Sequence, residues 1–72
     1  MKNAVAVQSS LLARVAYDSR RAILRVTFRD GAAYQYAGVP IEIYRGLLQA
    51  DSKGAYFNHC IRDLYPWRSA PL

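Results

Sequence analysis

The first half of the chain alternates apolar and polar residues with a period of two, which is typical of half-buried β-strands. Two such stretches, residues 11–17 and 22–28, flank a polar turn at residues 18–21. Folding them into a hairpin makes one face apolar and places Arg14 opposite Arg25 on the other face. The expected pairs are Tyr17 with Ala22, Val15 with Leu24, Ala13 with Val26, and Leu11 with Phe28.

The next turn, at Asp30 and Gly31, can close in two ways. A two-residue turn would place Tyr34 and Tyr36 on the outer face and bury Gln35. A three-residue loop, with Gly31 in the left-handed conformation, places both tyrosines on the apolar face and leaves Gln35 in water. Because an unpaired buried amide costs about 1–3 kcal/mol, we expect the three-residue loop. The expected pairs are Tyr34 with Val26 and Tyr36 with Leu24.

The second half of the chain has apolar residues at helical spacing in two stretches, residues 40–49 and 55–64. Pro40 stands at the first helical position, where its missing N–H is harmless. Residues 51–54 break the pattern and offer N-caps for the second helix. The apolar sides comprise Pro40, Ile41, Ile43, Tyr44, Leu47 and Leu48, and then Phe57, Cys60, Ile61 and Leu64. We therefore expect an α+β fold, in which a three-stranded antiparallel meander is followed by two helices packed on one face of the sheet.

With 72 residues, the chain has room for one small domain with one thin hydrophobic core. We expect that core within residues 7–68, with flexible ends at residues 1–3 and 69–72. No apolar run approaches the roughly 20 residues of a membrane span, and none has the length of a secretory signal. A single cysteine, Cys60, excludes an internal disulfide, so we expect a cytoplasmic location.

The residue types that support catalysis or metal binding are few. His59 and Cys60 are the only histidine and cysteine in the sequence. Adjacent residues on a helix point about 100° apart, so the two do not form a catalytic dyad. Cys60 falls on the apolar side of its helix, where we expect it in the core. One histidine and one cysteine also fall short of a zinc site, so we expect no enzymatic activity, no metal and no cofactor.

The charge balance favours an anionic partner. Ten lysines and arginines oppose five acidic residues, which gives a net charge of +5. Arg14, Arg25 and Arg29 fall on the outer face of the expected sheet, with Arg25 and Arg29 about 13 Å apart along one strand. They form either an anion-binding stripe or a solvated face whose side-chain stems cover Leu12 and Ile23. Bound phosphate would relieve the repulsion between Arg14 and Arg25.

A second basic cluster is expected around the second helix. Lys53 lies near its start and Arg62 near its end, with Tyr56 between them as a candidate for stacking on a base. The alternative for Lys53 is a solvated side chain beside a capped helix. Tyr65 is a further stacking candidate, and Trp67 either packs against the tail or stands free.

A series of short motifs runs through most of the chain, roughly residues 7–68. They comprise Ser9-Ser10, Val15-Ala16-Tyr17-Asp18, Leu24-x-Val26-x-Phe28-x-x-Gly31, Tyr34-x-Tyr36, Val39-Pro40, Ser52-Lys53-Gly54-x-Tyr56-Phe57-Asn58 and Ile61-Arg62. Together they resemble the KTSC domain, which occurs at the C-terminus of some lysyl-tRNA synthetases and as small stand-alone bacterial or phage proteins. The resemblance implies no enzymatic activity and suggests RNA binding. Ala16 departs from the glycine that is typical of the family.

These observations predict a small non-catalytic module that binds nucleic acid, RNA before DNA, mainly through phosphate contacts of an arginine-rich surface. The expected contact residues are Arg14, Arg25, Arg29, Lys53, Tyr56 and Arg62. The alternative is a protein–protein interaction module that uses an exposed edge strand or the outer sheet face. The apolar residues expected on that face are Leu12, Ile23, Ala33 and Ala37. We expect a monomer or weak dimer that makes no membrane contact.

Overall fold

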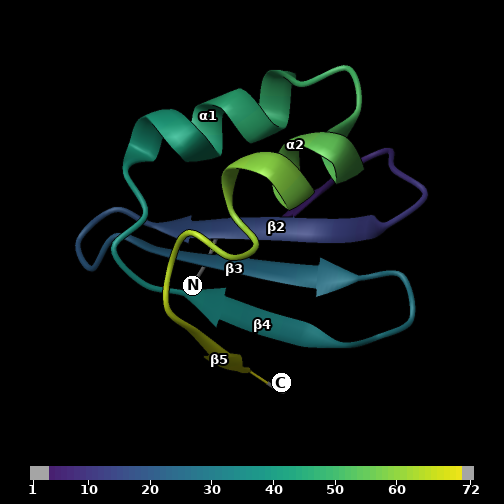
Figure 1. The fold of residues 1–72 in the computed structure, drawn as a ribbon. Coiled ribbons are helices and arrows are strands. Elements are labelled where there is room, and N and C mark those ends of the chain that lie inside the picture. The colour runs from purple at the N-terminus through teal and green to yellow at the C-terminus, as the bar shows by residue number, and fades with distance from the viewer. Residues whose placement is uncertain (1–3, 71–72) are drawn as a thin grey trace.

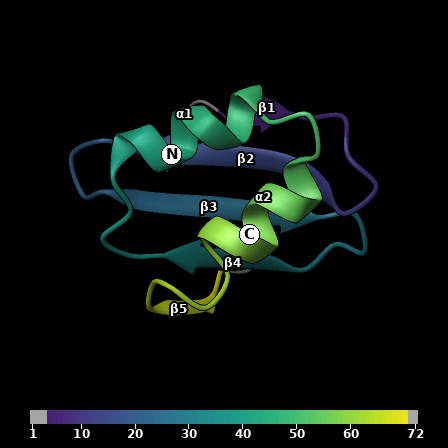
Figure 2. The ribbon, with the colours of Figure 1, turned by 45° about the horizontal axis from the view of Figure 1, so that its top comes forward.

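A five-stranded antiparallel sheet forms one layer of the protein, and two helices cover one of its faces (Figures 1 and 2). The computed structural model describes residues 4–70. The sheet contains β1 (Val5–Ala6), β2 (Leu12–Asp18), β3 (Ile23–Phe28), β4 (Ala33–Tyr36) and β5 (Trp67–Ser69), and the helices are α1 (Ile41–Gln49) and α2 (Lys53–Cys60). The α+β class is confirmed, but a meander of three strands is too narrow, because β1 and β5 extend the sheet at its two edges.

The β2–β3 hairpin differs from the expected register by two residues. Tyr17 pairs with Leu24 rather than with Ala22, and Arg14 lies opposite Thr27 rather than opposite Arg25. The turn keeps its four residues but lies one residue further along the chain, at residues 19–22. Asp18 stabilises it, because its carboxylate accepts hydrogen bonds from the N–H groups of Arg20 and Arg21 at 3.0 and 3.3 Å. Between Arg14 and Asp18, a shift of two residues leaves the side chains on their expected faces.

A β-bulge at Ala13 reverses the expected positions of Leu11 and Leu12. Leu12 pairs with Phe28 while Arg14 pairs with Thr27, so Ala13 is the extra residue. Leu12 is consequently fully buried and Leu11 is exposed. The expectation that Leu12 lies on the outer face is therefore wrong.

The β3–β4 hairpin closes through the expected three-residue loop. Val26 pairs with Tyr34 and Leu24 with Tyr36, and Gly31 has a φ of +95°. The side chain of Tyr36 is buried, whereas that of Tyr34 is half-buried. The register, the conformation of Gly31 and the burial of Tyr36 are thus confirmed, and Tyr34 remains partly open to solvent.

The hydrophobic core lies between the sheet and the helices. Its buried residues are Val7, Leu12, Val15, Leu24, Val26, Tyr36, Val39, Leu47, Phe57 and Ile61. Pro40 is the N-cap of α1, and Ser52 caps α2 by accepting a hydrogen bond from the N–H of Ala55 at 3.3 Å. Helix α2 ends at Cys60, four residues before the expected end, because the chain turns at Ile61. That turn buries Ile61 and leaves Leu64 exposed, so the expected core position of Leu64 is wrong.

The C-terminal segment is part of the sheet rather than a loose tail. Ser69 belongs to β5. Ala70 is buried, and its N–H donates to the carbonyl of Ala33 at 2.8 Å. The expected flexible ends at residues 1–3 and 71–72 lie outside the described residues. Within residues 4–70, neither helix has the length and apolar character needed to cross a membrane.

Candidate functional site

The arginines expected on the outer face are largely engaged by the protein itself. Arg25 is half-buried, and its Nη2 donates to the carbonyl of Ala70 at 2.8 Å. The guanidinium of Arg29 donates to the carbonyls of Ser9 and Val7, in the segment that joins β1 to β2. Only Arg14 is exposed without a side-chain hydrogen bond to residues 4–70. The three arginines therefore do not form a continuous free stripe.

The second expected cluster is divided by the length of α2. Lys53 begins the helix, and its Nζ donates to the carbonyl of Ala50 at 3.0 Å. Arg62 lies beyond the other end of the helix. Tyr56 is half-buried between the helices, and its hydroxyl donates to the carbonyl of Ile43 at 3.0 Å. The expectation that Tyr56 is an exposed stacking residue is therefore wrong.

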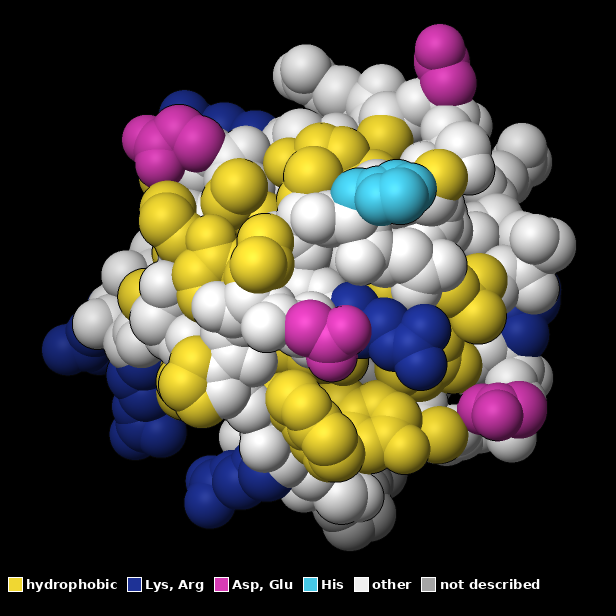
Figure 3. All heavy atoms as spheres, viewed as in Figure 1, with side chains coloured by type: hydrophobic (Ala, Val, Ile, Leu, Met, Phe, Trp, Pro, Cys, Tyr) yellow, Lys and Arg dark blue, Asp and Glu magenta, His cyan; other side chains and the backbone are white. Residues whose placement is uncertain are grey.

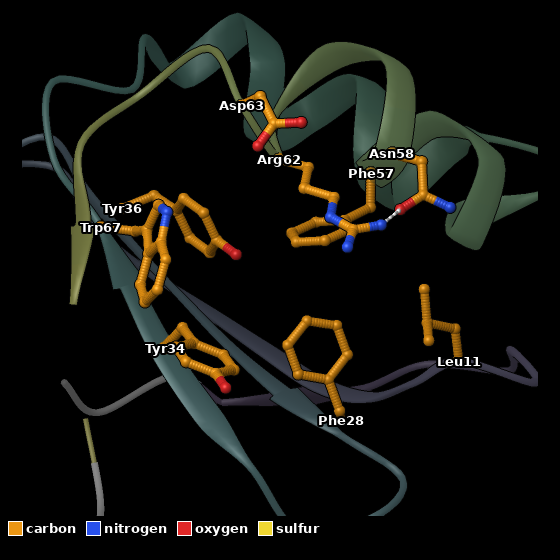
Figure 4. A pocket seen from close by; sticks show the side chains of 9 residues that line it. All are labelled: Leu11, Phe28, Tyr34, Tyr36, Phe57, Asn58, Arg62, Asp63 and Trp67. Atoms are coloured by element: carbon orange, nitrogen blue, oxygen red, sulfur yellow. Dashed lines mark hydrogen bonds between the residues drawn. The ribbon is translucent and has the colours of Figure 1, made fainter. Parts of the chain in front are cut away.

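A groove of about 430 Å³ opens where the end of α2 faces the sheet (Figure 4). We call it the aromatic groove. It is lined by Leu11, Phe28, Tyr34, Tyr36, Phe57, Asn58, Arg62, Asp63 and Trp67. Figure 3 shows hydrophobic side chains that lie open to the surface on this face, next to basic and acidic side chains.

The rings of the aromatic groove hold one another by edge-to-face contacts. Phe28 contacts Tyr34 and Phe57, with ring centroids 5.7 and 5.3 Å apart. Tyr36 contacts Phe57 at 5.5 Å, and Trp67 contacts Tyr34 at 5.3 Å. The pairing of β5 with β4 places Trp67 beside Tyr36, and the indole remains 57% exposed. The rings of the groove therefore support one another, and the large side chain of Trp67 is open to solvent.

Polar groups gather at the rim of the aromatic groove. Arg62 is exposed, and its Nη1 donates to Oδ1 of Asn58 at 3.5 Å, a long hydrogen bond. Asp63 is exposed and makes no ion pair with any residue in the range 4–70. The two side chains are thus available to a molecule that enters the groove.

The hydroxyl of Tyr36 points into the aromatic groove (Figure 4). The residue is only 4% exposed, yet this hydroxyl has no hydrogen-bond partner among residues 4–70. Burial raises the pKa of Tyr36, Tyr34 and Asp63 raise it further, and the positive charge of Arg62 lowers it. No buried polar side-chain atom among residues 4–70 lacks a partner, so the hydroxyl of Tyr36 reaches solvent in the groove, where it is open to water or a ligand.

The remaining candidates for chemistry are dispersed. Cys60 is half-buried and His59 is exposed on α2. In the part of the chain that the structure describes, no three His, Cys, Asp or Glu side chains group as metal ligands. A second hollow, of about 210 Å³, lies on the other side of Trp67, where Pro66 and Arg68 meet Ile23, Gln35 and Ala37.

Sequence reasoning found only one of the nine residues of the aromatic groove, Arg62. Phe28, Tyr34 and Tyr36 were expected simply as core. Their role in an open surface depends on Trp67, whose position depends on β5. The six tyrosines, many for a chain of 72 residues, are the indication that the sequence offers.

This chain belongs to the KTSC domain family. The family model matches residues 8–65. An uncharacterized protein of Stutzerimonas stutzeri is 47% identical over 58 residues, which cover 81% of this chain and 82% of that relative. A protein of Tsukamurella paurometabola is 38% identical over 59 residues, covering 82% and 88%.

The fold matches a solved KTSC domain protein. The crystal structure of a KTSC domain protein from Yersinia pestis is 31% identical in sequence and superimposes with a TM-score of 0.91. The match covers 94% of this chain and 96% of the other. The five-stranded sheet with two helices on one face is therefore shared with that protein.

Proposed function

We propose that the protein is a non-catalytic module that binds single-stranded nucleic acid, RNA before DNA, with an unpaired base held in the aromatic groove. One observation carries the proposal: open aromatic rings surround the unpartnered hydroxyl of Tyr36 beside the exposed guanidinium of Arg62. Aromatic faces bind bases by stacking, and a neighbouring cation attracts the phosphate backbone.

The shape of the groove favours a single strand over a duplex. In a duplex the faces of the bases are stacked on one another, whereas an unpaired base offers both faces to Trp67 and its neighbours. Base–aromatic stacking contributes about 1–3 kcal/mol per base. The net charge of +5 adds long-range attraction to the strand.

The preference for RNA rests on the resemblance to a domain found in some lysyl-tRNA synthetases. The site differs from the phosphate stripe that the sequence favoured, because Arg25 and Arg29 are engaged by backbone carbonyls. Arg14 and Arg68 stay exposed on the outer face of the sheet, where they add to the overall positive charge rather than to the groove.

Binding of a fluorescent single-stranded oligouridine at about 50 mM salt tests the proposal. Trp67→Ala and Arg62→Ala should each weaken binding about tenfold, because one removes a stacking surface and the other a cation. Arg45→Ala, at an exposed position of α1, is the matched charge control and should bind normally. Wild-type affinity in both groove variants, or no binding by the wild-type protein, would exclude this function.

A protein-interaction module is the second candidate, and β5 is the observation that favours it. All three residues of this edge strand are exposed, so its outer side is open to another strand. The outer sheet face gives it little support, because Leu12 and Ala33 are buried. Strand addition should persist at about 500 mM salt, whereas contacts to phosphates should weaken steeply.

A further inference from the structure

We propose that the aromatic groove selects guanine, an inference that rests on the proposed binding of a single-stranded nucleic acid. The lining of the groove is aromatic or aliphatic except at one rim, where Asn58, Arg62 and Asp63 lie together (Figure 4). The rings accept any base, because every base has a flat face. Discrimination among bases must therefore come from these three polar side chains and the hydroxyl of Tyr36.

The carboxylate of Asp63 favours a base with two neighbouring donors. It is free of ion pairs within residues 4–70, and its two oxygens only accept hydrogen bonds. Guanine presents N1–H and the N2 amino group side by side, which matches both oxygens. Adenine and cytosine offer an amino donor beside a ring-nitrogen acceptor, and that acceptor's lone pair would face the second oxygen. Uracil has one ring N–H between two carbonyl acceptors.

The guanidinium of Arg62 supplies the complementary half of the pattern. Guanine carries two neighbouring acceptors, O6 and N7, which an arginine contacts in a bidentate manner. Asn58 accepts a hydrogen bond from Nη1 of Arg62 and so directs the guanidinium across the groove (Figure 4). Because Arg62 and Asp63 are consecutive residues in the turn after α2, the donors and acceptors arrive at adjacent atoms of one base.

The surroundings strengthen this discrimination. Tyr36 is nearly buried, and its hydroxyl points into the groove that Arg62 and Asp63 also line (Figure 4). A base that covers this rim excludes water from it. Hydrogen bonds in such an environment are stronger than in water, and an unmatched polar atom there is left without a partner. A base other than guanine leaves at least one oxygen of Asp63 without a hydrogen-bond partner.

Five single-stranded RNA pentamers test the inference directly: UUGUU, UUAUU, UUCUU, UUUUU and UUIUU, where I is inosine. The wild-type protein should bind UUGUU about tenfold more tightly than UUUUU. Inosine keeps O6, N7 and N1–H but lacks the amino group, so UUIUU should bind with intermediate affinity. The inosine comparison needs no variant and is therefore independent of any effect of substitution on folding.

Asp63→Asn provides the second arm of the test. The amide keeps the size of the side chain but replaces one acceptor with a donor, so the preference for UUGUU over UUUUU should fall from about tenfold to about threefold, which is the part that Arg62 supplies. Asp51→Asn is the matched control, since Asp51 is also exposed and its loss changes the net charge by the same amount. This control should retain the preference for guanine.

The outcomes separate this inference from the proposed function. A guanine preference that Asp63→Asn reduces and Asp51→Asn retains supports the inference. Equal binding of UUGUU and UUUUU by the wild-type protein, or a preference that Asp63→Asn leaves unchanged, overturns guanine selection. In that case a tenfold loss in Trp67→Ala still supports the groove as a nucleic-acid site. If none of the pentamers binds the wild-type protein at about 50 mM salt, both proposals fail.

Discussion

Arg25 and Arg62 carry the same charged group, but only Arg62 holds it where a ligand can reach it. The guanidinium of Arg25 lies across the outer face of the sheet and donates to the Ala70 carbonyl at 2.8 Å. That of Arg62 is exposed at the groove, and its one hydrogen bond within residues 4–70 is the 3.5 Å contact with Asn58. The partner of an arginine, rather than its charge, therefore separates arginines that build the fold from those available for binding.

The tyrosines divide in the same way. The hydroxyl of Tyr17 donates to the carbonyl of Val39 at 2.6 Å, and that of Tyr56 to Ile43 at 3.0 Å. The first hydrogen bond joins β2 to the segment before α1, and the second joins α2 to α1. The hydroxyl of Tyr36 has no such partner within residues 4–70 and faces the aromatic groove. The hydroxyls of Tyr17 and Tyr56 thus bond within the fold, whereas that of Tyr36 is left for water or a ligand.

The largest expected effect on stability is at Gly46, which lies against Tyr56. A Cβ added there would collide with the hydroxyl and ring of Tyr56, so Gly46→Ala should destabilise the protein by about 2 kcal/mol in urea denaturation. Helix propensity alone predicts the opposite sign, a gain of about 1 kcal/mol. Gly54→Ala in α2 is the matched control, since its Cβ would meet Leu11 only at an ordinary 3.5 Å. A Gly46→Ala protein as stable as wild type would contradict the tight contact between the helices.

The next effect separates the two arginines. Arg25→Ala should lower the free energy of unfolding by about 1–2 kcal/mol, because it removes a charge-assisted hydrogen bond to Ala70, the residue after β5. Arg62→Ala should change it by less than about 0.5 kcal/mol, since the residue is exposed. This reverses the expectation from sequence, in which Arg25 faced Arg14 and its loss relieved repulsion. If the two variants are equally stable in urea, Arg25 does not stabilise the fold more than Arg62 does.

The successes and errors of the sequence analysis have physical causes. The β3–β4 loop was predictable because the wrong alternative buried Gln35. The β2–β3 register was not, because a shift of two residues preserves the alternation of faces and leaves the hydrophobic pattern unchanged. The bulge at Ala13 has no local sequence mark, and β1 and β5, with two and three exposed residues, are too short to show alternation.

The site was harder to predict than the fold because it is assembled from distant segments. Its residues come from the approach to β2, the β3–β4 hairpin, the end of α2 and β5. The position of Trp67 cannot be predicted unless β5 is recognised. Without that strand, Tyr34 and Tyr36 look like ordinary core residues. Arg62 could be named from its charge, whereas the engagement of Arg29 by backbone carbonyls depends on where the β1–β2 segment lies.

A smaller difference is expected between two tyrosine variants. Tyr56→Phe should destabilise the protein by about 1 kcal/mol, because the hydrogen bond to Ile43 is lost. Tyr36→Phe should change the free energy of unfolding by no more than about 0.5 kcal/mol, since its hydroxyl has no partner within residues 4–70. Both changes in the free energy of unfolding can be measured by urea titration at neutral pH. A larger loss in Tyr36→Phe than in Tyr56→Phe would show that the hydroxyl facing the groove also supports the fold.

The smallest effect concerns the same hydroxyl at alkaline pH. Burial raises the pKa of Tyr36 in the folded protein above its ordinary value of 10.0. Above pH 10 the unfolded chain loses this proton more readily than the folded protein, so the free energy of unfolding falls as pH rises toward the folded pKa. Below pH 10 this contribution is fully present and constant. Tyr17, Tyr44 and Tyr56, whose pKa values burial also raises, add to the same decline. The urea midpoint of the wild-type protein should therefore be lower at pH 10.5 than at pH 9, and this fall should be smaller in Tyr36→Phe. An equal fall in the two proteins would mean that solvent, rather than the protein, surrounds this hydroxyl.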